Sequence, residues 1–569
     1  LLHRVADGLA ANRGRLLGVM AREAGKTFAE GDPEVSEAID LARYYADLIP
    51  GLSDSADAQR FHPYRTVAVV PPWNFPLAIP GGGVYAALAA GAAVIFKPAP
   101  ETVATAWLIA EIAWEAGIPR DVLQFVPTAD GDAGRRLVTH DDIDAVVFTG
   151  SWDTARRFLG WRPDLPLHAE TSGKNAVVVT AAADLDSAVT DIVRSAFGHA
   201  GQKCSAASLA ILEASVYDDQ RFMHQLADAV SSLRPGPGWA LTSTMGPIIR
   251  APEGPLDDAL HRLDPGERWL VEPRMLDGNP RLWSPGVKLG VRPGSSFHLT
   301  ECFGPVLGLM RAADLDEAIA LQNEPVYGLT AGLQSLDPAE IATWRERVQA
   351  GNLYVNRHIT GAIVRRQSFG GWKRSVIGPG AKAGGPNYVA SLGTWTGDFT
   401  GSAAEFEAAV ARHARDHMAP RDDTGLLAES NVFRYRPLRR VLVRAGADVD
   451  DRHVELALAA ARAFGTTVSL SSPVPRNLPI SVTVEDERSL AQRLDQAGVD
   501  KLRLLGEVSD DLRLAVYDSH VWLDDIPVVA EPGREALRWA REQAVSETRH
   551  RHGNVSDRRP GLVSPEPER

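Results

Sequence analysis

Residues Thr66-Val67-Ala68-Val69-Val70 form an unbroken apolar run, which ends in the turn Pro71-Pro72-Trp73-Asn74-Phe75-Pro76. A strand that is apolar at every position, and not only at alternate ones, indicates parallel pairing with both faces of the sheet covered. In such sheets ligands bind beyond the carboxyl ends of the strands. This stretch therefore predicts an α/β domain and marks the turn after the strand as a candidate site segment.

The same alternation continues on both sides of this strand. Residues 1–45 have helical spacing of their apolar side chains, and further strands and helices follow after residue 84. We expect a doubly wound α/β domain. The expected elements are the helix Tyr85–Ala93, strand Ala93–Lys97, helix Ala104–Ala116, strand Leu123–Val126, helix Gly131–Val138, strand Ala145–Thr149 and helix Trp152–Leu159.

Two further α/β units follow in the sequence. The second runs from about Lys174 to Arg374 and begins with the strand Asn175–Val179. A charged helix at Ala404–Met418 precedes the third unit, which has no cysteine and no Gly-rich phosphate loop, so we expect a lid or assembly role for it. Its expected elements are the strand Val441–Val443, helix His453–Phe464, strand Thr467–Leu470, helix Arg488–Ala497 and strand Leu502–Leu505.

Composition narrows the class of protein. The 569 residues carry 60 Lys plus Arg against 73 Asp plus Glu, a net charge of −13, which opposes binding of nucleic acid or an anionic membrane. Two cysteines cannot form a disulfide framework, so a reducing cytoplasm fits best. The apolar runs are too short to span a bilayer, and no signal peptide is visible. Because the chain opens with Leu1 in a helical pattern, we expect a fragment whose start lies upstream.

Cys204 is the first candidate catalytic residue. It lies in the small, loop-forming segment Gly198-His199-Ala200-Gly201-Gln202-Lys203-Cys204-Ser205, where the neighbouring lysine would favour the nucleophilic thiolate. The alternative is a buried cysteine that packs as a small hydrophobe. Glu170, upstream in the sequence, offers a carboxylate that could act as a base.

Three further positions carry chemistry in the predicted first domain. Gly150 and Ser151 join a strand to a helix start, where backbone N–H groups can bind a pyrophosphate; the alternative is an ordinary N-cap serine. Lys97 closes a strand, so it is either near a cofactor or solvated. Asn74 presents amide donors on a rigid, proline-bracketed turn, which suits an oxyanion site, although an asparagine in a turn often only satisfies backbone groups.

Taken together, these motifs resemble the aldehyde dehydrogenase superfamily over about Leu1 to Trp395. Within it, the segments around Glu170, Asn356, Gln367 and Lys382 look like the glutamate-γ-semialdehyde (pyrroline-5-carboxylate) dehydrogenase branch. Phe433–Leu438 and Arg541–Asn554 resemble the carboxyl-terminal domain of long bifunctional proline utilization A proteins. The motifs in register are Trp73-Asn74-Phe75-Pro76, Phe148-Thr149-Gly150-Ser151, Glu170 with Gly173-Lys174, Gly201-Gln202-Lys203-Cys204 and Glu301-Cys302-Phe303-Gly304-Pro305.

The resemblance implies an aldehyde dehydrogenase fold: a Rossmann-like NAD-binding domain and an α/β catalytic domain, followed by a smaller α/β carboxyl-terminal domain. The implied division is an NAD-binding domain at 1–173, lacking its start, a catalytic domain at 174–374, a connecting and oligomerisation segment at 375–440, a carboxyl-terminal domain with a lid motif at 441–557, and a disordered tail at 558–569.

The resemblance also implies roles for individual residues. Cys204 would attack the aldehyde, the amide of Asn74 would stabilise the oxyanion, and Glu170 would activate water. NAD would be the cofactor, with FAD present only if a proline dehydrogenase module precedes Leu1, and no metal is expected. The implied NAD-binding residues are Lys97, Gly150, Ser151, Glu301, Phe303 and Trp73, and the implied substrate-binding residues are Ser205, Gly361, Ala362, Phe75, Phe369 and Lys203.

The expected partners are a small-molecule substrate and other copies of the chain in a homo-oligomer. Two departures from the family pattern put the local loop shape in question: Ser368 stands where the family has proline, and Trp372–Ala381 is about two residues longer than the common form. Two alternative functions remain at this point. One is a dehydrogenase for another ω-semialdehyde, and the other is a non-catalytic scaffold for assembly or channelling.

Overall fold

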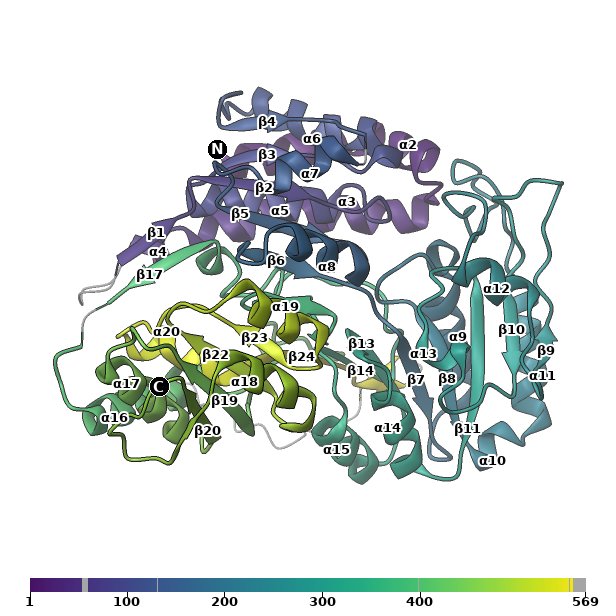
Figure 1. The fold of residues 1–569 in the computed structure, drawn as a ribbon. Helices are drawn as coiled ribbons and strands as arrows, with labels where there is room; N and C mark the ends of the chain where they lie inside the picture. Colours follow the sequence, from purple (N-terminus) through teal and green to yellow (C-terminus); the bar gives the residue numbers. More distant parts are fainter. Residues whose placement is uncertain (54–59, 130, 398, 552, 556–569) are drawn as a thin grey trace, which may run out of the picture.

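The computed structural model describes residues 1–53, 60–129, 131–397, 399–551 and 553–555. Its three large sheets form three lobes (Figure 1). The amino-terminal lobe is purple to blue, the central lobe teal, and the carboxyl-terminal lobe green to yellow. The predicted α/β class and the aldehyde dehydrogenase fold are confirmed. The predicted disordered tail at 558–569 lies outside the described residues.

A six-stranded sheet organises the first lobe, in the order β16-β6-β5-β2-β3-β4. All its pairs are parallel except β6 with β16. The predicted strand at Thr66–Val70 is β2, as expected. The other strands are β3 (Ala93–Phe96), β4 (Leu123–Phe125), β5 (Ala145–Thr149), β6 (Leu167–Glu170) and β16 (Val376–Ile377), and a separate pair joins β1 (Arg60–Pro63) to β17 (Gly393–Thr396).

Both faces of this sheet are buried, as an apolar strand requires. Val67 and Val69 of β2 belong to one apolar core, and Ala68 and Val70 belong to another on the opposite face. The second of these cores also contains leucines of the carboxyl-terminal lobe, so the two lobes share it. The helices of the first lobe are α1 (Leu2–Ala11), α2 (Arg13–Glu23), α3 (Phe28–Leu48), α4 (Pro50–Ser53), α5 (Ala78–Ala90), α6 (Val103–Glu115), α7 (Asp132–Val138) and α8 (Trp152–Trp161).

Helix α5 begins at Ala78, seven residues before the predicted start at Tyr85. The sequence did not indicate this earlier start, because the added part contains three consecutive glycines, which are weak helix formers. A side chain at Gly82 would lie 3.0 Å from Leu41 on α3, and one at Gly83 would lie 2.9 Å from Val69 on β2. The glycines therefore let α5 pack closely between a helix and the sheet. The cost of glycine in a helix, about 1 kcal/mol per residue, is offset by this packing.

The second lobe contains a nine-stranded sheet in the order β18-β24-β14-β13-β7-β8-β11-β10-β9. Two of its strands, β18 (Glu429–Pro437) and β24 (Ala540–Thr548), come from beyond residue 374, and β24 pairs in parallel with β14 (Asn352–Val355). The sheet thus draws on the predicted connecting segment and carboxyl-terminal domain, and the division into domains stays a prediction. The other strands are β7 (Asn175–Val179), β8 (Ala207–Glu213), β9 (Arg268–Val271), β10 (Gly286–Leu289), β11 (Val306–Ala312) and β13 (Thr330–Gln334).

The third lobe is a five-stranded parallel sheet in the order β21-β20-β19-β22-β23, which confirms the predicted alternation of strand and helix. No helix in the described part of the chain is long and apolar enough to cross a membrane. The strands are β19 (Arg440–Ala445), β20 (Thr467–Ser472), β21 (Val482–Val484), β22 (Lys501–Leu505) and β23 (Trp522–Asp524), and the helices are α16 (Ala403–His417), α17 (Asp451–Ala463), α18 (Glu487–Arg493), α19 (Asp510–Asp518) and α20 (Pro532–Ala536).

Candidate active site

The carboxyl ends of the first sheet gather the predicted site residues at one edge. Asn74 follows β2, Lys97 follows β3, and Gly150 follows β5, while Glu170 ends β6. The loop that carries Cys204 comes from the second lobe, between α9 (Leu185–Phe197) and β8. This loop packs against Gly173, which follows β6. A side chain at Gly173 would lie only 2.8 Å from the carbonyl oxygen of Cys204, so glycine permits this close approach.

The loop before Cys204 has an unusual backbone. His199 and Ala200 both have positive φ, at 52° and 54°, and Gly201 follows at 71°. A Cβ at Gly201 would overlap the carbonyl oxygen of Gly304, in the loop that carries Glu301 and Phe303. The nucleophile loop and a predicted cofactor loop are therefore in direct backbone contact, and only glycine fits between them.

Replacing Gly201 by alanine should therefore destabilise the protein. We expect Gly201→Ala to lower the free energy of unfolding by about 2–4 kcal/mol, since it adds a backbone clash to the cost of a positive φ. Gly278→Ala is the matched control, because Gly278 has φ +63 and no atom within 4 Å of the added Cβ; we expect about 1 kcal/mol there. Denaturant unfolding measures both, and equal losses would contradict the proposed contact.

Cys204 is half-buried and lines a pocket. Burial raises the pKa of its thiol well above the ordinary value, and the carboxyl groups of Glu170 and Glu301 raise it further. Lys203, expected from the sequence to favour the thiolate, is paired with a carboxylate instead. The Lys203 ammonium is buried and forms an ion pair with Glu30. Burial raises the pKa of the Glu30 carboxyl, but the positive charge and the hydrogen bond of Lys203 outweigh this effect and lower the pKa to about 2.

Lys203 also departs from its predicted place in substrate binding. Among the described residues, those that line the aldehyde pocket include Cys204 and Ser205 but not Lys203. The Glu30 carboxylate on α3 holds the Lys203 ammonium in an ion pair. We therefore give Lys203 a structural role, in which it fixes the nucleophile loop to α3.

Asn74 is held close to the loop of Cys204, and two N–H groups there are candidates for an oxyanion site. Asn74 is buried, and one hydrogen of its amide is committed to the carbonyl of Gln202 at 3.1 Å, which orients the side chain. The other amide hydrogen stays available. Within the described residues, no acceptor takes the backbone N–H of Cys204. Rigid donors aimed before charge develops are what an oxyanion site requires.

Glu170 has the properties of a general base. It lines the same pocket as Cys204, and burial raises its pKa to about 7, against the lowering effect of the Lys382 ammonium. Its Oε1 atom has no hydrogen-bond partner among the described residues, so it can accept a proton from water. A base with a pKa near the working pH is the most effective, because it is both available and strong enough.

The pocket extends from Cys204 to the predicted anchor for a substrate carboxylate. It encloses about 830 Å³, including solvent at its mouth, and both Phe75 and Phe369 line it. Three donors of its lining residues have no acceptor among the described residues: the Ser205 hydroxyl and the backbone N–H groups of Gly361 and Ala362. The structure thus brings the predicted substrate residues together, apart from Lys203.

Glu37 is a pocket residue that sequence reasoning missed. It comes from α3, far from every motif, and burial raises its pKa to about 8, aided by Glu34. Its signal in the sequence is weak, because a glutamate in an amphipathic helix is ordinarily a solvated residue. In the pocket it adds a carboxyl group beside the donors at Gly361 and Ala362.

The predicted cofactor residues come from the ends of strands in the first sheet and from the loop that carries Glu301 and Phe303. Ser151 is the N-cap of α8 and accepts a hydrogen bond from the Thr154 N–H at 3.2 Å. The alternative prediction, an ordinary N-cap serine, therefore holds for its side chain. The capped helix start still offers N–H groups for a pyrophosphate beside Gly150. Lys97 is buried at the end of β3.

In the second lobe, Glu301 accepts the Gly173 N–H at 3.0 Å, and burial raises the pKa of its carboxyl. Phe303 has φ 56, and its ring meets that of Trp73 edge to face at 5.8 Å. The Lys97 ammonium, the Glu301 carboxylate and the N–H groups at the start of α8 are donors and acceptors that suit ribose hydroxyls and phosphates. The residues therefore fit a dinucleotide such as NAD.

Comparison with known proteins agrees with this geometry. Residues 1–393 match the Aldehyde dehydrogenase family. A 1-pyrroline-5-carboxylate dehydrogenase of Geobacillus sp. (strain WCH70) is 35% identical over 414 residues, which cover 68% of this chain and 78% of that protein.

Two solved structures are similar. Proline Utilization A (PutA) from Corynebacterium freiburgense has a TM-score of 0.88 and 45% identity, over 97% of this chain and 57% of that one. The chain thus spans little more than half of that protein's length. A 1-pyrroline-5-carboxylate dehydrogenase from Thermus with bound NAD has a TM-score of 0.65 and 31% identity, over 69% of this chain and 79% of that one.

The chain belongs to the aldehyde dehydrogenase family. Within the family, its resemblance is to the 1-pyrroline-5-carboxylate dehydrogenases, and over nearly its whole length to PutA.

Proposed function

We propose that this chain oxidises L-glutamate γ-semialdehyde, the open form of 1-pyrroline-5-carboxylate, to L-glutamate with NAD, the second step of proline catabolism. One observation carries the proposal: a single pocket joins Cys204 and Glu170 to three donors, at Ser205, Gly361 and Ala362, that have no acceptor among the described residues. A semialdehyde with a terminal carboxylate needs both a nucleophile for its aldehyde and donors for its carboxylate.

The first chemical step uses Cys204 as nucleophile. The thiol of Cys204 would give its proton to solvent water, and the sulfur would then attack the aldehyde carbon to give a hemithioacetal. The free amide hydrogen of Asn74 and the backbone N–H of Cys204 would stabilise the oxyanion. Bound NAD would supply the acceptor for the hydride, which would leave the oxidised carbon on Cys204 as a thioester.

Water then releases the product. Glu170 removes a proton from a water molecule, which attacks the thioester carbon, and the thiol of Cys204 leaves. Lys97 and Glu301 would hold the ribose hydroxyls of the cofactor, the start of α8 at Ser151 would hold its pyrophosphate, and Trp73 and Phe303 would border the nicotinamide side.

The two ends of the substrate meet complementary groups. Its α-carboxylate would accept hydrogen bonds from the donors at Ser205, Gly361 and Ala362, without a fixed cation. Its methylenes would lie between Phe75 and Phe369. We assign Glu37 to the α-ammonium group, whose positive charge would lower the raised pKa of this carboxyl and favour its carboxylate form in the complex.

Glu37→Gln should raise the KM for glutamate semialdehyde about tenfold, since about 1.4 kcal/mol of ion pairing is lost. The KM for succinate semialdehyde, which lacks the ammonium group, should stay within twofold. Initial rates with both aldehydes give the two constants. An equal rise for both would show that the variant had damaged the pocket and that Glu37 does not recognise the ammonium.

The direct test of function is an assay of the purified chain with NAD and each semialdehyde, followed by NADH absorbance. We expect a higher kcat/KM with glutamate semialdehyde than with succinate semialdehyde. A preference for succinate semialdehyde would replace the proposal with a different ω-semialdehyde dehydrogenase. A folded, NAD-binding chain that made no NADH with either would be a scaffold.

The likeness to PutA over 97% of the chain supports a wider proposal. We infer that the chain acts within a bifunctional polypeptide in which a proline dehydrogenase module with FAD supplies the semialdehyde, and that it forms a homo-oligomer. Both cysteines have free thiols, which supports a cytoplasmic location. We assign no role in nucleic-acid binding.

A further inference from the structure

A buried lysine lies beside the proposed general base. The Lys382 side chain is 1% exposed, and its ammonium donates to the Asn352 Oδ1 at 2.8 Å and to the carbonyl of Gly370. Gly370 and Glu170 line the same small cavity. The strand β16, just before Lys382, pairs Val376 with Glu170. The backbone thus brings the segment of Lys382 next to Glu170, and the following residue, Ala383, lines the same pocket as Glu170.

The partner of Lys382 comes from the carboxyl-terminal part of the chain. Glu542 lies on β24 and is buried, and its Oε2 atom accepts the backbone N–H of Lys382 at 2.8 Å. Its Oε1 atom accepts from the Asn387 amide at 2.7 Å, and its backbone carbonyl accepts from the indole of Trp372 at 2.9 Å. One strand therefore holds both ends of the segment that carries the lysine.

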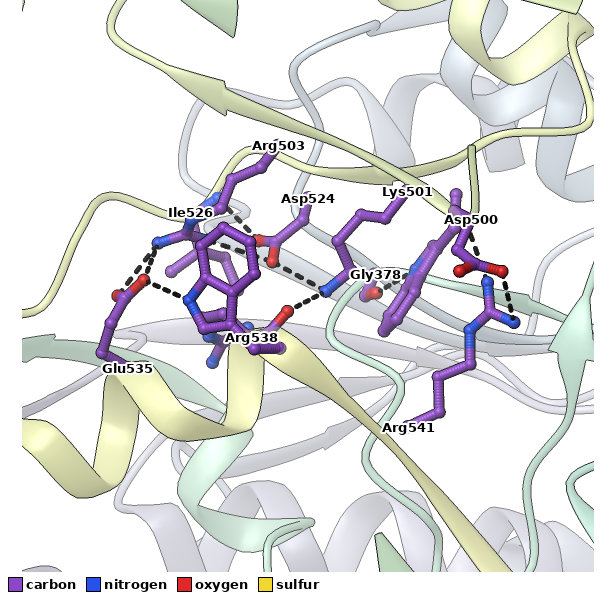
Figure 2. A network of polar contacts seen from close by, with 11 residues as sticks. Gly378, Asp500, Lys501, Arg503, Asp524, Ile526, Glu535, Arg538 and Arg541 are labelled. Carbon is purple, nitrogen blue, oxygen red and sulfur yellow. Dashed lines mark hydrogen bonds and ion pairs between the residues drawn. The ribbon is translucent and has the colours of Figure 1, made fainter. Parts of the chain in front are cut away.

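A second set of contacts fixes this arrangement from the third lobe (Figure 2). Arg541, next to Glu542, pairs with Asp500, and Lys501 donates to the carbonyl of Arg538 at 2.7 Å. The indole of Trp522 donates to the carbonyl of Gly378 at 3.0 Å, four residues before Lys382. Both the strand of Glu542 and the loop of Lys382 are therefore tied to the same sheet edge.

The Lys382 ammonium is the positive charge near the buried carboxyl groups of Glu170 and Glu542. Because an unpaired buried charge is costly, the charge state of each of these groups depends on the others. We propose that Lys382, held by Glu542 of strand β24, is the positive charge that keeps the general base Glu170 in its carboxylate form. This rests on the proposed function of Glu170. It makes Lys382 and Glu542 positioning residues for thioester hydrolysis, and makes the carboxyl-terminal strand part of the active site.

The electrostatic directions agree with this geometry. Burial lowers the pKa of Lys382 to about 7, while Glu542 and Glu170 raise it. Lys382 in turn lowers the pKa of Glu170, which burial raises to about 7. Burial raises the pKa of Glu542, and Asn387, Lys382 and Arg421 lower it. The negative charge of Glu170 also raises the pKa of Cys204, Glu37, Tyr45 and Tyr388. The negative charge of Glu542 raises the pKa of Tyr435 and Tyr44.

The test is the pH profile of thioester hydrolysis in Lys382→Met and Glu542→Gln. It is measured as the decay of the acyl-enzyme that forms with the first NADH. Removing the ammonium should move the acidic limb of the profile up by about one pH unit, about a tenfold loss below pH 7 that recovers at higher pH. Glu542→Gln should move it in the same direction by less, because Lys382 then loses its proton at lower pH. The double variant should shift no further than Lys382→Met.

Lys373→Met is the matched control. Lys373 lies on the same segment, and burial lowers its pKa to about 8 in the same way, but its ammonium donates to the carbonyls of Asn323 and Pro325. We expect its hydrolysis profile to match the wild type. If Lys382→Met fails to fold, Glu542→Gln and its profile still decide the matter.

A wild-type limb that stays in place in both Lys382→Met and Glu542→Gln, or shifts additively in the double variant, would overturn the proposal. The rate of the first NADH burst separates this result from a failure of the proposed function. An active wild type with an unshifted limb rejects only the role of Lys382, whereas a wild type with no burst rejects the dehydrogenase itself.

Discussion

Cys204→Ser should reduce NADH formation from glutamate semialdehyde by at least about a thousandfold, while the protein still folds and binds NAD. Among the described residues that line the pocket, the Cys204 thiol is the group best able both to add to the aldehyde and to leave from an acyl intermediate. A serine hydroxyl ionises far less readily, and its ester is hydrolysed more slowly. Turnover, NAD binding and thermal unfolding measure the three properties separately.

The second cysteine provides the matched control. Cys302 is buried, and its thiol donates only to the carbonyl of Thr300 at 3.6 Å. Cys302→Ser should therefore retain turnover within a few-fold. Substantial activity in Cys204→Ser would show that the nucleophile has been misassigned. An equal loss in both variants would indicate that the loops around Gly304 fail to assemble.

Glu170→Gln should separate the two halves of the reaction. We expect one NADH per active site in a first burst, followed by turnover about 10²–10⁴-fold slower than in the wild type, because the thioester lacks a base to activate water. Intact-protein mass should then show a persistent acyl group on Cys204. A variant that lost the burst and the later turnover equally would contradict the assignment of Glu170 to hydrolysis.

The pH dependence gives an independent check on the same residue. A base with a pKa of about 7 is a carboxylate above that pH and is protonated below it, so wild-type hydrolysis should fall as the pH drops through 7. Glu170→Gln has no such group and should show no titration there. A limb near pH 7 that persisted in the variant would belong to another residue.

Local sequence was sufficient for the elements and for most of the site. The strand at 66–70 and the apolar strands that follow it were predictable because unbroken apolar runs with helical stretches between them admit few arrangements. The residues after β2, β3 and β5 were predictable for a related reason, since parallel strands present their carboxyl ends at one edge.

Side-chain direction was not predictable in the same way. Lys203 stands next to Cys204 in the chain but points to Glu30, and Glu37 enters the pocket from a helix with no motif. The resting pKa of Cys204 also depends on distant groups, since burial and two carboxyl groups outweigh any local effect. Electrostatic environment depends on what surrounds a residue in space, and sequence spacing carries little information about it.

The sequence by itself was enough to predict the chemistry proposed for this protein: a cysteine nucleophile, a glutamate base and a dinucleotide site at the edge of a parallel sheet. Only the tertiary structure decided how that chemistry is tuned. Glu542 approaches Lys382 across 160 residues of chain, and β24 joins the sheet beside β14. Such contacts form because burial must pair charges wherever the fold brings them together, and that pairing is set by packing between distant segments.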